Sequence, residues 1–179
     1  MFLLFEKGYP LVIVAEEQHS DMKRIVRLTQ QRFLADGSED IDRVQWKIPI
    51  TIFTKSLKQQ FLMEQSEITI TVENVSPNDW IKLNYHSLGL YRVQYPSDNL
   101  KRFREPITTK VFSPQDRLMI QDDLAAFCYA GYHSFDEYFQ LLLSYQDEDN
   151  FSVWKSISKN KLFRSGFCIE KEKLVFFSV

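Results

Sequence analysis

The residues that could perform chemistry are few and widely spaced in this 179-residue chain. Its three histidines are His19, His86 and His133, and none has a second histidine three or four positions away. Hydrolytic zinc sites commonly combine two histidines one helical turn apart with a carboxylate, so that three ligands meet at one point. The spacing therefore predicts no metal site, and we expect the histidines at the surface or in loops.

Other catalytic signatures are also missing. The sequence has no glycine-rich phosphate loop, no Gly-x-Ser-x-Gly elbow and no cysteine next to a histidine that would activate it. The acidic run at residues 146–150 lacks the spacing of an EF-hand calcium loop, and we interpret it as a solvated helix entrance. We predict no catalytic residue and no metal ligand in the chain.

Three charged residues, Asp116, Arg117 and Asp123, stand out because they lie on a predicted helix near its start. They could line a peptide-binding surface, where the planar guanidinium of Arg117 would bind a carboxylate. We favour a structural interpretation. Asp116 would assist the helix start, and Arg117 would tie the helix to the preceding strands through Asp122 or Asp123.

Trp80 and Arg92 complete the set of candidate residues from the strand-rich part of the chain. Trp80, like Trp46 and Trp154, is large and apolar, so we expect it first in a core. The predicted contacts between the two parts of the chain involve Asp116, Arg117, Asp123, Arg92 and Trp80.

The composition excludes several classes of partner. The chain has 22 basic and 24 acidic residues, for a formal net charge of -2 without a dominant block of either sign. This balance argues against nucleic-acid and anionic-membrane partners. No apolar run approaches the roughly 20 residues that cross a bilayer, so we expect a soluble globular protein.

Two observations bear on the cellular compartment. The apolar start of the chain is interrupted by Glu6, Lys7 and Pro10 and has no basic region before it, which argues against a secretory signal. The two cysteines, Cys128 and Cys168, are too few for a disulfide scaffold. We predict a cytoplasmic location, with Cys128 as a buried thiol.

The elements that must position these residues follow from a change in hydrophobic rhythm near Ser113. Before it, apolar and polar residues mostly alternate, as in strands with one buried face. Residues 80–85 and 90–95 flank a short link, which predicts a hairpin whose Gly89 adopts a positive φ. The other predicted strands are 9–14, 22–33, 46–53 and the alternating part of 59–75.

From Ser113 onward the apolar residues recur at helical spacing. Residues 113–131 begin with a capping serine and a proline and end at Gly131, which predicts one well-bounded helix. A connecting helix is predicted within 98–110, and a third long helix near residue 150 that carries Val153, Trp154 and Ile157. The change in rhythm predicts that a strand-built part precedes a helix-built part.

The helix after Gly131 is predicted from a capping box. Ser134 and Glu137 are spaced so that each side chain can accept a hydrogen bond from the backbone N–H of the other. His133 then lies before the helix, and we do not expect it to share a helical face with Glu137. Tyr138, Leu141, Leu142 and Tyr145 give this helix an apolar face that favours an antiparallel helix pair.

The predicted fold class is α+β in two parts. An N-terminal antiparallel β-sandwich occupies residues 1–96, a connecting helix 97–112, and an α-helical, helix-hairpin segment 113–179. The tail is expected to be irregular from about residue 163, although residues 174–177 have a strand-like composition without an evident partner.

Short pieces of the sequence resemble, in a fixed order, the C-terminal half of zinc aminopeptidases of the puromycin-sensitive and aminopeptidase N type, over about residues 8–157. Each piece is weak alone, and their colinear succession is specific. The pieces are Gly8-Tyr9-Pro10-Leu11, Gln30-x-Arg32-Phe33, Trp46-x-Ile48-Pro49-Ile50, Trp80-Ile81-Lys82-Leu83-Asn84, Gly89-x-Tyr91-Arg92-Val93-x-Tyr95, Ser113-Pro114-x-Asp116-Arg117 through Asp123, Ala130 and Gly131, and Val153-Trp154.

This resemblance implies a place within a larger enzyme. The strand-rich part would be the β-sandwich that follows a thermolysin-like catalytic domain, and Ser113 would begin a helical domain that closes over the active site and helps admit peptides. Complete relatives use a zinc-bound water to cleave N-terminal residues from peptides. The family's His-Glu-x-x-His and Gly-x-Met-Glu-Asn motifs are absent here, so the resemblance gives this chain no catalytic residue and no cofactor of its own.

The leading hypothesis is therefore a non-catalytic portion of such an aminopeptidase. Its expected partners are the catalytic domain and the remaining helices of the parent enzyme, which would cover an exposed apolar helix face. The alternative is an interaction or regulatory module that binds a partner or a full-length aminopeptidase. Leu3 and Glu6, where the family has tryptophan and glutamine, and the residues after about Leu162 depart from the family, which predicts a fragment, a truncated product or a partial gene model.

Overall fold

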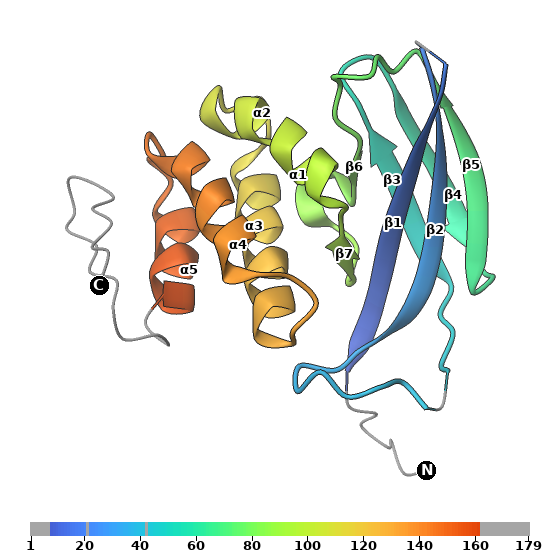
Figure 1. The fold of residues 1–179 in the computed structure, drawn as a ribbon, viewed down its shortest axis with the longest axis horizontal. Coiled ribbons are helices and arrows are strands. Elements are labelled where there is room, and N and C mark those ends of the chain that lie inside the picture. Colours follow the sequence, from blue (N-terminus) through green and yellow to red (C-terminus); the bar gives the residue numbers. More distant parts are fainter. Residues whose placement is uncertain (1–7, 21, 42, 162–179) are drawn as a thin grey trace.

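The computed structural model of the chain describes residues 8–20, 22–41 and 43–161. Its strands lie on one side of the molecule and its helices on the other (Figure 1). The predicted α+β architecture in two parts is confirmed. The predicted irregular tail, the strand-like segment 174–177 and Cys168 lie outside the described residues, and the domain boundaries at residues 96 and 112 stay a prediction.

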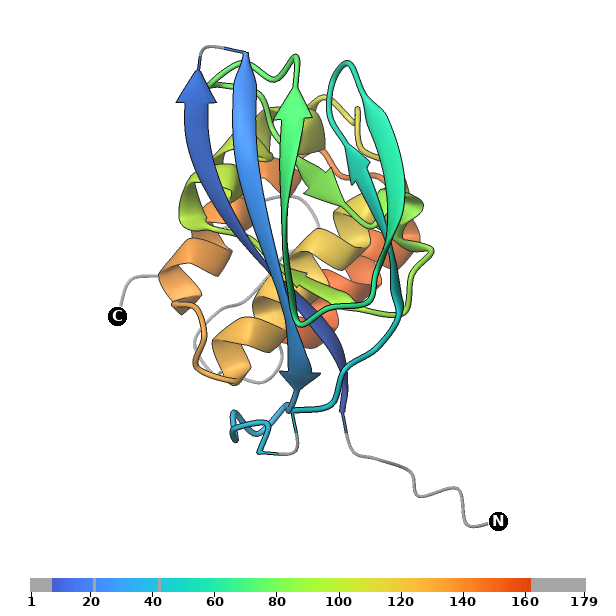
Figure 2. The same ribbon diagram turned by 90° about the vertical axis from the view of Figure 1, so that its right-hand side faces the viewer.

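Seven strands in the described residues form two sheets. The four-stranded sheet has the order β5-β2-β1-β7 and the three-stranded sheet the order β4-β3-β6. Figure 2 shows β1, β2 and β5 side by side, with the helices behind them. The strands are β1 Tyr9–Ser20, β2 Lys23–Phe33, β3 Ile48–Phe53, β4 Lys58–Met63, β5 Glu67–Glu73, β6 Lys82–Leu83 and β7 Arg92–Gln94.

The alternation of apolar residues explains why these strands form a sandwich. The inward row of β3 is buried, and β1, β2 and β5 contribute β-branched and leucine side chains to the same core. At the edge of its sheet, β5 buries Val72 and leaves Ile68 and Ile70 half-buried. The buried residues of this core include Val12, Val14, Val26, Leu28, Ile48, Ile50, Ile52 and Val72.

The predicted hairpin at residues 80–95 was wrong. β6 pairs with β3, whereas β7 pairs in parallel with β1 in the other sheet, and the short 3-10 helix η1 (Tyr85–Ser87) joins them. The parallel pair makes the larger sheet mixed rather than fully antiparallel. When a turn separates two apolar runs, the sequence indicates that the chain reverses direction there. It does not indicate which strands the two runs pair with, because those partners are far away in the sequence.

The loop between β6 and β7 is held by one side chain. The Asn84 amide donates to the carbonyl oxygens of Gly89 at 3.0 Å and Tyr91 at 3.3 Å, and its Oδ1 accepts from the Gly89 N–H at 2.8 Å. Left-handed φ angles occur at Asn84, His86 and Ser87. Gly89 does not adopt the predicted positive φ. It is required for space instead, since a Cβ there would lie 2.2 Å from the Tyr91 ring.

The helical part contains five α-helices in the described residues. Two short ones, α1 and α2, occupy the predicted connecting segment, and α3, α4 and α5 form the packed group that follows. Their bounds are α1 Ser97–Arg102, α2 Arg104–Thr108, α3 Pro114–Tyr129, α4 Phe135–Leu142 and α5 Phe151–Lys161, with the short 3-10 helix η2 (Leu143–Tyr145) after α4.

The predicted bounds of α3 are confirmed at both ends. Ser113 accepts a hydrogen bond from the Asp116 N–H at 3.2 Å, as an N-cap does. Gly131 has a φ of 83°, and the backbone N–H groups of Gly131 and Tyr132 donate to the carbonyls of Cys128 and Phe127. This is a Schellman motif, in which the left-handed residue lets the last carbonyls find partners.

The capping box of α4 is only half formed. Ser134 accepts from the Glu137 N–H at 3.3 Å, as predicted. The Glu137 carboxylate, however, binds the Ser97 hydroxyl and the Nδ1 of His133, the latter at 2.8 Å. His133 lies before the helix, as predicted, but the turn before α4 brings its imidazole back over the first helical turn, where it meets Glu137.

A continuous buried cluster joins the strands to the helices. The predicted faces of α3, α4 and α5 are buried, and Cys128 is buried as expected, with burial raising the pKa of its thiol to about 12. The predicted exposed apolar helix face is not found on α5, where Ser152, Lys155, Ser158 and Lys159 face outward and Phe151 is the one large apolar exception among the described residues.

Candidate functional site at the junction of strands and helices

The candidate residues from the sequence gather around α3. This helix buries Asp116, Arg117, Gln121 and Asp123 together with its apolar residues. Burying a charge without a partner costs several kcal/mol, so each of these side chains requires a counterpart from a neighbouring element. The counterparts of Asp116 and Asp123 define a polar junction between the strands and the helices.

Asp116 meets Lys82 at the start of α3. The Lys82 Nζ lies 2.7 Å from the Asp116 carboxylate, and both side chains are almost completely buried. Lys82 also donates to the carbonyl oxygens of Leu83 at 2.9 Å and Asn84 at 3.0 Å. Burial lowers the pKa of Lys82, and Asp116 opposes this effect. The pair fastens the end of β6 to the first turn of α3.

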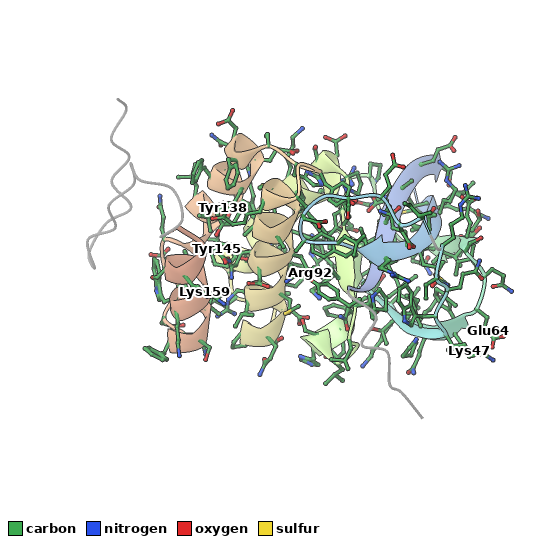
Figure 3. The ribbon with its side chains drawn as sticks, turned by 90° about the horizontal axis from the view of Figure 1, so that it is seen from below. Lys47, Glu64, Arg92, Tyr138, Tyr145 and Lys159 are labelled. Atoms are coloured by element: carbon green, nitrogen blue, oxygen red, sulfur yellow. The ribbon has the colours of Figure 1, made fainter. Side chains whose placement is uncertain are left out.

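Asp123 meets Arg92 about two turns further along α3. Arg92 Nη1 donates to Asp123 at 2.6 Å and to Asp122 at 2.9 Å, and the Val93 N–H donates to Asp123 at 3.0 Å. Figure 3 shows Arg92 where α3 meets the strands. Its Nε also donates to the Tyr9 hydroxyl, so β7 binds both α3 and β1 through one side chain.

Burial dominates the electrostatics of Asp123. Loss of solvation raises the pKa of this carboxyl to about 6, although Arg92 and the Val93 N–H act in the opposite direction. For Arg92, burial alone would lower the pKa, but Asp123 and the Tyr9 hydroxyl raise it overall. Arg92 therefore stays charged, and Asp123 is the member of the pair that titrates in the mildly acidic range.

Arg117 was expected to bind Asp122 or Asp123, but it binds neither of them. Its guanidinium binds Glu148 in a bidentate manner, with contacts of 2.6 and 2.8 Å, and donates to the Phe112 carbonyl oxygen at 2.6 Å. Burial would raise the pKa of Glu148, but the hydrogen bonds from Arg117 and from the Asn150 N–H lower it overall. Arg117 thus ties α3 to the segment that leads into α5, within the helical part.

Glu148 corrects the prediction for the acidic run. Most of residues 146–150 are exposed as expected, but the Glu148 side chain is buried and accepts from the N–H groups of Asp149 and Asn150. The available signal was Arg117 itself, because an arginine facing a helix core requires a buried acid. Sequence spacing alone did not indicate which of the nearby acids would serve.

Trp80 has the predicted place in the core. It is 1% exposed, and its ring centroid lies 5.0 Å from that of Phe53 and 4.7 Å from that of Phe112. Phe53 ends β3 and Phe112 lies just before α3. Trp80 is therefore an apolar contact between the smaller sheet and the segment that leads into α3, beside the Lys82 pair.

A further buried cluster was missed by sequence reasoning. Arg24 on β2 and Arg102 on α1 both bind Glu16 on β1, at 3.0 and 3.2 Å. Arg24 also donates to the backbone carbonyls of Ser76 at 2.7 Å and Asp79 at 3.0 Å. Burial raises the pKa of Glu16, and the two arginines offset only part of that effect. No local pattern marks these residues, because their partners are set by the sheet register.

The histidines do not come together. His86 Nδ1 lies 3.7 Å from Asp116 at the start of α3, whereas His133 Nδ1 lies 2.8 Å from Glu137 in the first turn of α4. Among the described residues, no three His, Cys, Asp or Glu side chains form a group that could hold a metal ion. In the same part of the chain, no helix is both long and apolar enough to span a membrane. What the junction can do chemically is hold elements in a fixed relation.

We predict a strong coupling between Arg117 and Glu148. Arg117→Met leaves the Glu148 carboxylate buried without its partner, which should lower the free energy of unfolding by about 3–5 kcal/mol. Adding Glu148→Leu should recover part of that loss, as measured by urea unfolding. The matched control is the exposed Lys110–Asp149 pair, where Lys110→Met should lower the free energy of unfolding far less than Arg117→Met does, because water screens an exposed pair. Additive effects of the two changes at Arg117 and Glu148 would contradict this coupling.

We also predict a pH dependence that depends on Asp123. Its carboxyl should take up a proton near pH 6 in the folded chain, whereas an unfolded aspartate does so near pH 4. The folded state then binds more protons between these values, so this group contributes stability that grows as pH falls from 7 to 4, up to about 3 kcal/mol. The difference in unfolding free energy between the wild type and Asp123→Asn, measured from pH 7.5 to 4, should change in that direction. A pH-independent difference would contradict the prediction.

Comparison with protein families matches residues 80–161 to the ERAP1-like C-terminal domain. The matched stretch begins at Trp80 and includes β6, β7 and α1 to α5. It therefore contains every α3 candidate and the two strand residues, Lys82 and Arg92, that bind them.

Known proteins match more of the chain. Puromycin-sensitive aminopeptidase of Caenorhabditis elegans is 32% identical over 158 residues, which are 86% of this chain and 17% of that protein. Aminopeptidase M1-D of Oryza sativa subsp. japonica is 32% identical over 164 residues, 86% of this chain and 18% of that protein. Tricorn protease-interacting factor F2 of Thermoplasma acidophilum is 32% identical over 147 residues, which are 82% of this chain and 17% of that protein.

The chain thus spans less than a fifth of the length of these relatives. Aminopeptidases recur among the matches, and the family model covers the helical part and the strands that it binds. The chain belongs to the family of puromycin-sensitive aminopeptidase and the aminopeptidases M1, and it is a non-catalytic portion of such an enzyme.

Proposed function

We propose that this portion serves a zinc aminopeptidase by holding its helical domain in a fixed orientation. The observation that carries the proposal is the set of ionic links between strands and helices: Lys82 with Asp116, Arg92 with Asp123, and Glu16 with Arg102. Breaking such a link leaves a buried charge without a partner, so the helices resist reorientation against the strands.

The whole enzyme would remove N-terminal residues from peptides. Its zinc ion and the ligands of that ion would belong to the catalytic domain, since the described residues of this chain do not form a metal site. Zinc there would supply an activated water for peptide hydrolysis. The partners of this portion are the catalytic domain and the further helices of the enzyme, and the proposed location is the cytoplasm.

A second candidate function is an interaction module for a full-length aminopeptidase. It is favoured by the loop between β6 and β7, where Leu88 is 81% and Leu90 is 93% exposed. Asn84 holds the loop rigid from inside, so little conformational freedom would be lost when a partner covers the two leucines. The two leucines supply apolar area that a partner would bury on binding.

The first function predicts an inactive chain. The purified 179-residue chain should release no fluorophore from an aminoacyl-coumarin substrate and should contain no stoichiometric zinc by elemental analysis, because it carries no group of metal ligands in its described residues. The puromycin-sensitive aminopeptidase of Caenorhabditis elegans, assayed in parallel, controls for substrate and buffer. Turnover by the purified chain that a chelator abolishes would disprove the proposal.

The second function predicts binding through the two leucines. The chain should co-elute with a full-length aminopeptidase of the family and change its rate, and Leu88→Ser with Leu90→Ser should weaken this association at least 10-fold. Leu62→Ser on β4 is the matched control, because Leu62 is also exposed, at 52%, and β4 lies at the opposite edge of its sheet from β6. No co-elution together with an unchanged rate would exclude this function.

A further inference from the structure

A groove between α1 and α4 lies outside the polar junction. The two helices contact each other (Figure 1). The groove between them has a volume of about 180 Å³. Its apolar side is formed by Leu100 on α1 and Leu141 on α4, which are 7% and 2% exposed. Such a floor can bury an apolar group of a few carbon atoms.

Charged residues of both signs line this groove, and the two signs come from different helices. Lys101 and Arg104 come from α1 and α2, and Asp136 and Glu137 come from the first turn of α4. Two of the four are already engaged, since Lys101 binds Asp98 at 2.9 Å and Glu137 binds Ser97 and His133. The other two, Arg104 and Asp136, are exposed.

Arg104 and Asp136 do not bind each other. Neither side chain has an ion-pair or hydrogen-bond partner within the described part of the chain, although both line the same groove. The groove therefore presents a guanidinium from α2 and a carboxylate from α4 beside an apolar floor. A ligand that complements this arrangement must carry a cation, an anion and an apolar group.

We propose that the groove binds a small zwitterion with an apolar side chain, that is, a free α-amino acid or a short peptide. Its carboxylate would accept two hydrogen bonds from Arg104, its ammonium group would bind Asp136, and its side chain would lie on Leu100 and Leu141. The volume is below that of typical drug-sized pockets, which suits a ligand of this size. The inference rests on the groove alone and does not depend on the proposed function.

Binding should be weak, with a dissociation constant on the order of 1 mM, because the groove is open and the charges remain partly solvated. The probes are L-leucine and glycyl-leucine, with leucinamide and 4-methylpentanoate as analogues that each lack one charge. Amide shifts of the 179-residue chain, followed by NMR during titration, should place binding at Leu100 and Leu141. Either zwitterion should bind at least 10-fold more tightly than both analogues, and the tighter zwitterion reports the charge separation that the groove accepts.

The variants Arg104→Gln and Asp136→Asn should each weaken binding of the better zwitterion at least 5-fold. Both side chains are exposed, so unchanged thermal unfolding should show that each variant stays folded. Lys155→Gln on α5 is the matched control, since it removes an exposed charge elsewhere. Equal binding of zwitterions and analogues, no shifts up to 20 mM ligand (about twenty times the expected dissociation constant), or retained binding in both groove variants would overturn the proposal.

Discussion

The structure depends on the burial of charged side chains along α3. This helix lies between the strands and the helices α4 and α5, so Asp116, Arg117 and Asp123 are buried. Each buried charge therefore determines which element must lie opposite it. Lys82 comes from β6, Arg92 from β7 and Glu148 from the approach to α5, so one position of α3 satisfies all three while a rotation or a one-turn shift would satisfy none.

These links provide orientation more than net stability. The desolvation of two charges offsets most of their mutual attraction, whereas an unmatched charge remains strongly unfavourable. Apolar packing around Trp80 and along the continuous core supplies the adhesion, and the ion pairs select one arrangement among those that adhesion alone would permit. Apolar packing thus gives stability and the ion pairs give orientation. This suits the proposed function, because a helical domain that is held in place needs one defined orientation as well as contact with the strands.

The sequence predicted what depends on near neighbours. The alternation in β5, the Ser113 cap and the Gly131 stop are each determined within a few residues, and the structure contains all three. It failed where the outcome depends on distant partners. The runs at 80–85 and 90–95 resemble a hairpin, but their strands pair with β3 and β1 instead. Arg117 binds the more distant Glu148 and not Asp122 or Asp123, which face the strands. Of the candidate site, sequence identified the charges on α3 and missed Lys82, Glu148 and Glu16, whose importance follows from the tertiary contacts.

The parallel pairing of β7 with β1 has a consequence for how the chain folds. Residues 11–13 pair with residues 92–94, so about half of the described chain must be in place before the inner edge of β1 is covered. Contacts of such long sequence separation form late, because closing a long loop costs entropy that local contacts do not. Until then β1 presents an open strand edge beside a row of valines, the kind of surface that pairs with other chains. Arg92 lies on β7 and binds both Tyr9 on β1 and Asp123 on α3. The pairing of β7 with β1 and the docking of α3 on the strands therefore occur together in one late step.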